Sequence, residues 1–131
     1  MREIKFKAWD LVKKEWFCHS FYVHESGTRI VDCNEFHHEI GTEVIVIQFT
    51  DFKNKKGVEL YQGCIIHYTK HKGYLLESFI GEVIWMKEAG CWGYRTFGYD
   101  YAFNSADEIQ FDIIDHIEVI GNIYENPELI S

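Results

Sequence analysis

The chain has 131 residues, of which 47% are hydrophobic and 17% aromatic, and its formal net charge is −8. This apolar content excludes an intrinsically disordered chain, because such chains lack the apolar area that offsets the entropy of ordering. The length fits one domain, or two small subdomains that share a core. The acidic charge disfavours binding to nucleic acid, unless the lysines at positions 53, 55, 56, 70 and 72 gather on one face.

The sequence gives no sign of a membrane or secreted protein. No window approaches the roughly 20 apolar residues of a membrane-spanning helix, and the first residues alternate charged with apolar side chains, unlike a secretory signal. We therefore expect a cytoplasmic protein. The cysteines at positions 18, 33, 64 and 91 form no Cys-x-x-Cys pair. We expect four reduced thiols, buried or half-buried, with no bound metal and no cofactor.

The first half of the chain has the periodicity of β-strands. Residues 4–8 alternate apolar side chains with lysines, and the aromatic stretch 16–23 follows a polar turn, so the two segments predict a β-hairpin. A short strand is expected over 29–32, followed by a histidine-rich loop. Residues 43–49 are the strongest strand, because a continuous β-branched run indicates burial on both faces. A charged turn at 51–57 ends it.

The second half continues in the same pattern. Gly81 is expected to bend a long strand, and Ser105 and Glu108 have capping-box spacing, enough for one helical turn. Short strands punctuated by glycines, with little helix, predict a mainly β fold, a small barrel or sandwich. The later strands are expected over residues 58–61, 64–69, 74–88, 92–103 (a strand or hairpin) and 117–124.

Four segments, spread over nearly the whole chain, carry a family resemblance. They are REIKFKAWD at 2–10, QFT at 48–50, LYQGCI at 60–65 and EVIGNIYENPEL at 118–129. In this order they resemble the YopX family of phage and prophage proteins. The resemblance implies an N-terminal β-rich extension, residues 1–42, and an SH3-like barrel, residues 43–131; the two parts could also fold as one compact unit. It implies no activity and no catalytic residues.

The chain also departs from the family pattern in two turns. The usual Thr-Gly-Leu-Lys-Asp reads Thr-Asp-Phe-Lys-Asn at 50–54, and the usual Tyr-Glu-Gly-Asp reads Tyr-Gln-Gly-Cys at 61–64, so two acidic positions are lost. Gly63 lies between two predicted strands, where its backbone freedom allows a sharp corner. Gly121 and Asn122 indicate a bend near the last strand. We interpret these motifs as signatures of the fold rather than of a function.

The cysteine, histidine and acidic residues do not have the spacing of a metal site or a catalytic site. Cys64, His67 and His71 would share a face of a helix, but the segment predicts a strand, on which the two histidines lie about 13 Å apart and the cysteine faces the other way. The cysteines and histidines at 18, 19, 24, 33, 37 and 38 have no standard ligand spacing, and the acidic residues at 107, 108, 112 and 115 indicate a solvated loop. Neither a Gly-x-Ser-x-Gly motif nor a phosphate loop occurs. We therefore predict no catalytic residue and no enzyme.

The best candidate for a binding surface is an aromatic row. Phe97, Tyr99, Tyr101 and Phe103 follow i, i+2 spacing, so an uninterrupted strand would place them on one face. Arg95 joins this row, and Trp92 and Tyr94 fall on the opposite face. Amphipathic aromatic residues are enriched at recognition sites. We predict Tyr99, Tyr101 and Arg95 as partner-binding residues; the alternative is that both rows pack in the core.

These observations favour a non-enzymatic protein-interaction module of phage or prophage type, acting in the host cytoplasm on a protein partner or by self-association. The alternative is a nucleic-acid-binding accessory protein, since small barrels also bind DNA or RNA. A metal-dependent enzyme ranks third. A focused basic patch would favour the second hypothesis, and three converging metal ligands the third.

Overall fold

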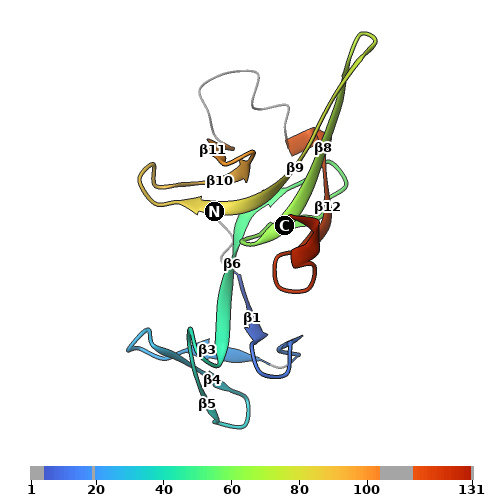
Figure 1. Cartoon of the computed structure of the whole chain (residues 1–131). Helices are drawn as coiled ribbons and strands as arrows, with labels where there is room; N and C mark the ends of the chain where they lie inside the picture. The colour runs from blue at the N-terminus through green and yellow to red at the C-terminus, as the bar shows by residue number, and fades with distance from the viewer. Residues whose placement is uncertain (1–4, 19, 104–113, 131) are drawn as a thin grey trace. The chain divides into compact units, whose positions relative to one another are not determined.

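The computed structural model describes residues 5–18, 20–103 and 114–130, and it is mainly β, as predicted (Figure 1). These ranges contain twelve strands and two single 3₁₀ turns, η1 (Ile114–His116) and η2 (Pro127–Leu129). Neither helical segment is long and apolar enough to cross a membrane. The predicted helical turn at 105–108 lies outside the described residues.

The chain forms two compact units, which we call the N-terminal unit (residues 5–48) and the C-terminal unit (residues 49–130). The division falls inside strand β6 (Val44–Lys53), whereas the sequence analysis placed a boundary before this strand. The first half of β6 pairs with β1 in the N-terminal unit, and its second half pairs with β7 in the C-terminal unit.

The N-terminal unit is built from two small antiparallel sheets. β1 lies between β2 and β6, and β4 lies between β3 and β5. Ala8, Ile30 and Val44 form a buried cluster, against which Phe17 and Phe21 pack. The strands are β1 (Phe6–Asp10), β2 (Glu15–Trp16), β3 (Phe21–Val23), β4 (Arg29–Asp32) and β5 (His37–Glu39).

Two sequence predictions for this unit are wrong in part. The aromatic stretch 16–23 is not one strand paired with the first: β2 pairs with β1, with Trp9 opposite Trp16, whereas β3 pairs with β4. The histidine-rich loop is partly a strand, because His37 and His38 belong to β5 and pair with β4. The turn residues in the sequence did not reveal that β4 pairs with a strand on each side.

The C-terminal unit contains a five-stranded antiparallel sheet in the order β11-β10-β9-β8-β12. In Figure 1 this sheet is curled, and the hairpin of β8 and β9 extends from it as a long arm that turns at Gly73–Tyr74. The buried side chains of the C-terminal unit include Phe49, Leu60 and Ile65. The strands of this unit are β7 (Glu59–Tyr61), β8 (Cys64–Lys72), β9 (Leu75–Met86), β10 (Cys91–Thr96), β11 (Tyr99–Ala102) and β12 (Ile117–Asn122).

A bulge in β6 and a buried asparagine shape the charged turn that follows. The β6–β7 register shifts between Phe49 and Lys53, and the Thr50 hydroxyl donates to the Leu60 carbonyl at 2.8 Å, which satisfies a carbonyl at the irregularity. Asn54 is buried, and its amide donates to the Ile117 carbonyl at 3.2 Å. The lysine-rich turn is therefore attached to the start of β12.

Gly63 makes the sharp corner that the sequence predicted. Its φ of +86° lies in the left-handed region, its N–H donates to Val83 at 2.9 Å, and its carbonyl accepts from Ile123 at 2.9 Å. A Cβ at this position would come within 2.9 Å of the Tyr124 ring. The Asn122 carboxamide oxygen accepts the N–H of Tyr124 at 3.0 Å, which shapes the loop that carries this ring. The family-like segments at 60–65 and 118–129 thus meet at one corner.

We predict that Gly63→Ala destabilises the protein much more than Gly73→Ala. Both glycines have positive φ, at +86° and +65°, but the space around Gly73 is empty within 4 Å. The alanine at 73 should cost about 1 kcal/mol for backbone strain. The alanine at 63 adds the collision with Tyr124, worth roughly a further 1–3 kcal/mol. Urea denaturation measures both, and equal losses would contradict the corner described above.

Candidate interaction site

A stack of aromatic rings crosses four strands of the C-terminal sheet. Tyr68 on β8 stacks on Phe79 of β9 with ring centroids 4.7 Å apart, Phe79 stacks on Tyr94 of β10 at 5.4 Å, and Tyr94 stacks on Tyr101 of β11 at 5.3 Å. Such pairs each contribute about 0.5–1.5 kcal/mol beyond the burial of their area. The ring stack, as we call these four residues, therefore ties β8, β9, β10 and β11 together.

Strand register explains two of the three ring contacts, whereas Tyr94 lies opposite Val83 and meets Phe79 only diagonally. Tyr68 lies directly opposite Phe79, and Tyr94 directly opposite Tyr101, so each pair shares one face of the sheet. The turn that pairs β10 with β11 consists of Phe97 and Gly98, whose φ angles are +52° and +80°. Positive φ at both central residues is the pattern of a two-residue type I′ hairpin, whose twist matches that of the strands.

This turn corrects the predicted aromatic row. Of the two alternatives for 92–103, the row assumed an uninterrupted strand, with Tyr94 on the opposite face from Tyr101; the segment is a hairpin, which places Tyr94 and Tyr101 on the same face. Phe97 is in the turn and is 81% exposed, so it does not belong to the row. Arg95 lies opposite Asp100 and on the other face from the tyrosines.

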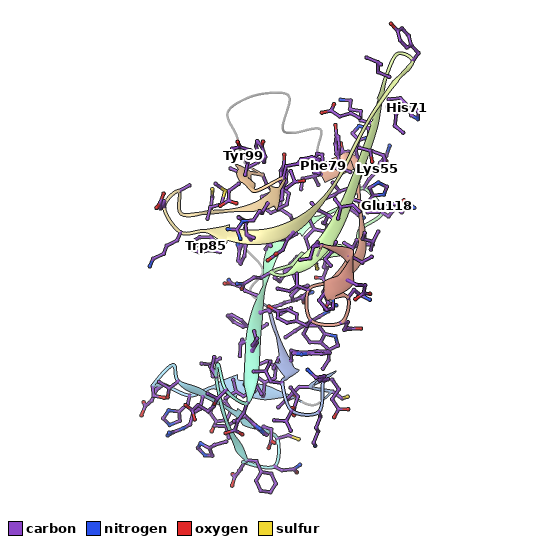
Figure 2. The ribbon with its side chains drawn as sticks, viewed as in Figure 1. Lys55, His71, Phe79, Trp85, Tyr99 and Glu118 are labelled. Atoms are coloured by element: carbon purple, nitrogen blue, oxygen red, sulfur yellow. The ribbon has the colours of Figure 1, made fainter. Side chains whose placement is uncertain are left out.

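The ring stack becomes more exposed toward the edge of the sheet. Tyr94 is 4% exposed, Tyr101 is 38% exposed, and Tyr99, in the same strand as Tyr101, is 68% exposed. β11 is the outermost strand of this sheet among the described residues. Figure 2 shows Tyr99 on this hairpin and Phe79 farther into the sheet. Of the predicted contact residues, the two tyrosines therefore lie together at the surface.

Arg95, the third predicted contact residue, is held in an ion pair. Its Nε lies 2.8 Å from an Asp100 carboxylate oxygen across the hairpin. This hydrogen bond raises the pKa of Arg95 and lowers the pKa of the Asp100 carboxyl. Both side chains stay charged at neutral pH, and they mark the face of β11 that the tyrosines do not occupy.

The histidines singled out in the sequence have structural neighbours. His67 lies on β8, a strand as predicted, and its Nε2 is 2.9 Å from the Ser78 hydroxyl on β9. His38 Nε2 is 2.9 Å from an Asp32 carboxylate oxygen, which lowers the pKa of Asp32, and its ring meets that of Phe17 edge-on. Across the ranges that the structure describes, no three histidine, cysteine or acidic side chains are grouped as metal ligands.

The predicted burial of the cysteines is only half right. Cys64 is buried and Cys91 is half-buried, but Cys18 and Cys33 are exposed. Both exposed cysteines belong to the N-terminal unit, whose short strands leave much of the chain at the surface. Wide spacing in the sequence carried no information on burial.

Sequence reasoning missed the inner half of the ring stack, although a signal was present. The hairpin turn between β8 and β9 consists of Gly73 and Tyr74, so Lys72 pairs with Leu75 and, four residues farther along each strand, Tyr68 pairs with Phe79. In the same way, the Phe-Gly step at 97–98 carries a glycine at a position that a two-residue hairpin turn uses. Counting outward from Phe97–Gly98 would have found the pair of Tyr94 and Tyr101, whereas the pair of Tyr68 and Phe79 requires the observed turn at Gly73–Tyr74.

These elements define a small, mainly β protein built on a curled antiparallel sheet. The model of the YopX protein family matches residues 5–131. The chain therefore belongs to the YopX family, as its four sequence segments indicated. Among solved structures, protein EF1440 from Enterococcus faecalis is similar over 100% of both chains, with 27% sequence identity and a TM-score of 0.65. No curated protein matches the chain.

The buried position of Tyr94 predicts a loss of stability in alkali. Burial first, and then the nearby Tyr101 and Tyr68, raises the pKa of Tyr94 from 10.0 to about 12. The protonated phenol is thus favoured in the folded state, so its contribution is complete below pH 10 and is lost as pH rises toward 12. The free energy of unfolding should fall across this interval, and less steeply in Tyr94→Phe. Identical slopes in the two proteins would show that Tyr94 ionises normally.

Proposed function

We propose that this protein is a non-enzymatic interaction module that binds a protein partner, or a second copy of itself, along β11. The observation that carries the proposal is the exposure of Tyr99 and Tyr101, at 68% and 38%, on the strand that is outermost in the described part of the sheet. Tyrosine rings offer a large contact area at a low entropic cost, and their hydroxyls tolerate water before the partner arrives.

The edge strand suggests how the partner binds. An extended segment can add to a free sheet edge, where main-chain hydrogen bonds supply affinity and alternate side chains supply specificity. On β11, Tyr99 and Tyr101 share one face and Asp100 lies on the other beside Arg95. An added strand would therefore meet aromatic rings on one face and an ion pair on the other.

The hydrogen-bond partners of two histidines support a non-enzymatic role. His38 joins β5 to Asp32 at the end of β4, and His67 joins β8 to Ser78 on β9. Each histidine thereby links neighbouring strands, which is a sufficient reason for its presence. Action in the cytoplasm of a host cell, in a phage or prophage context, belongs to the same proposal and rests on the family resemblance.

The lysine-rich turn favours a protein over nucleic acid as the partner. Lys56 Nζ lies 3.5 Å from a Glu118 carboxylate oxygen, and Asp115 and Glu118 line the same hollow as Lys55 and Lys56. Lys55 and Glu118 are labelled close to each other in Figure 2. Acidic groups among these lysines reduce the number of phosphates that the turn can neutralise.

Replacing Tyr99 and Tyr101 together by alanine should weaken binding while leaving the fold intact. We expect a stability loss of under about 1.5 kcal/mol, because Tyr99 is exposed and Tyr101 loses one ring stack. Self-association, measured by sedimentation velocity, or capture of a partner from cells that carry the gene, should fall markedly. Tyr74→Ala is the matched control, because Tyr74 is 96% exposed at the tip of the other hairpin.

Two results would contradict the proposal. The double variant could unfold at the temperature at which the wild type is stable, which would make the tyrosines core residues. It could also melt normally and bind as the wild type does, while Tyr74→Ala loses binding, which would move the contact surface to the tip of the β8–β9 hairpin.

A further inference from the structure

A row of charged side chains crosses the C-terminal sheet on the face opposite the ring stack. Arg95 of β10 lies directly opposite Glu82 of β9 on one side and directly opposite Asp100 of β11 on the other. Residues directly opposite one another share a face of the sheet. The three side chains therefore form one row, which we call the charge row, and its signs alternate from β9 to β11.

The arginine at the centre of the charge row interacts with both of its neighbours. Its hydrogen bond to Asp100 has the largest effect and raises the pKa of Arg95, and the charge of Glu82 raises this pKa further. Asp100, at the outer end, has an opposite charge across the strands only on its inner side among the described residues. Its side chain is 39% exposed. A carboxylate can accept about four hydrogen bonds, so the two from Arg95 leave Asp100 able to bind a second cation.

The main chain of β11 presents hydrogen-bonding groups to the outer edge at this same residue. Opposite residues of an antiparallel pair alternate between those that exchange main-chain hydrogen bonds and those that do not. The Phe103 N–H donates to the Trp92 carbonyl at 3.1 Å. By this alternation Tyr101 and Tyr99 bond to β10, whereas the N–H and carbonyl of Asp100 point away from it. A strand that adds to the edge of β11 would therefore bond to the main chain at Asp100.

A second copy of β11 does not complement this edge. When two copies pair so that both tyrosines lie opposite tyrosines, in either strand direction, Asp100 of one copy lies opposite Asp100 of the other. Like charges directly opposite each other destabilise strand pairing, and a charge on an edge strand is a common means of preventing it. The charge row therefore favours a different chain over a second copy.

We infer that the partner is a separate polypeptide that adds an extended segment to β11, with a lysine or arginine opposite Asp100 and an aromatic or β-branched residue on each side of it. The basic residue continues the alternation of the charge row. Its two neighbours point to the other face and cover Tyr99 and Tyr101. This inference rests on the proposed function, because it names the partner of the same edge.

The test is an NMR titration of the isotope-labelled full chain with three short peptides that differ at one position. The first is acetyl-Thr-Val-Lys-Val-Thr-amide, and the other two carry glutamine or glutamate in place of the lysine. The main-chain amide of Asp100 should shift with the lysine peptide, with a dissociation constant in the millimolar range. The glutamine peptide should bind roughly threefold more weakly, and the glutamate peptide about tenfold more weakly.

Three variants separate a contact at Asp100 from attraction to the acidic chain as a whole. Asp100→Lys should reverse the order of the peptides, so that the glutamate peptide binds best. Asp100→Asn, which removes the charge without adding a new one, should bind the lysine and glutamine peptides equally. Glu88→Lys is the matched control, because it changes the net charge as much as Asp100→Lys does but lies in the turn between β9 and β10. It should keep the wild-type order.

The outcomes distinguish this inference from the proposed function. Equal binding of the three peptides at β11 would overturn the inference and leave the proposed function in place. Self-association of the wild type that is lost in the Tyr99 and Tyr101 variant would do the same. A preference for the lysine peptide that persists in Asp100→Lys would also overturn the inference. No shift at β11 with any of the peptides would contradict both the inference and the addition of a strand at this edge.

Discussion

The C-terminal unit depends on the contact of aromatic rings across neighbouring strands. Tyr68, Phe79, Tyr94 and Tyr101 stack in sequence from β8 to β11, with centroid separations of 4.7, 5.4 and 5.3 Å. The register of the antiparallel sheet places Tyr68 opposite Phe79 and Tyr94 opposite Tyr101, so that these rings pack across the strands. Because the last ring lies in an edge strand, the same stack that stabilises the sheet also places tyrosine at the surface. The ring stack therefore both stabilises the sheet and positions the proposed binding surface.

Backbone conformation sets where the strands of this sheet begin and end. Gly63 allows the corner between β7 and β8, and the ring of Tyr124 fills the space that a side chain at this position would need. At the other end of the sheet, positive φ at Phe97 and Gly98 produces the tight hairpin. The family-like segments at 60–65 and 118–129 thus have a physical meaning: they are the two sides of one corner, joined by the hydrogen bond from Ile123 to Gly63.

Periodicity predicted the mainly β class and most strands, because alternation of apolar and polar residues is a local property of the chain. The corner at Gly63 was also predictable, since glycine between two strands has few other roles. The face of Tyr94 was predicted wrongly, because the aromatic row assumed an uninterrupted strand, whereas the turn at Phe97–Gly98 reverses which residues are neighbours. The pairing of β3, β4 and β5 was missed for a related reason: strand partners are chosen by packing across the unit, which a local pattern does not encode.

The central claim is that Tyr101 belongs to the ring stack while Tyr99, two residues away, is free to serve as a contact. A double-mutant cycle measures this directly, using Tyr94→Leu with Tyr101→Leu and, separately, Tyr94→Leu with Tyr99→Leu. Our account predicts a coupling free energy of about 0.5–1.5 kcal/mol for Tyr94 with Tyr101. For Tyr94 with Tyr99 it predicts a value near zero. Equal coupling in the two cycles, or none for Tyr94 with Tyr101, would contradict a stack that ends at the edge of the sheet.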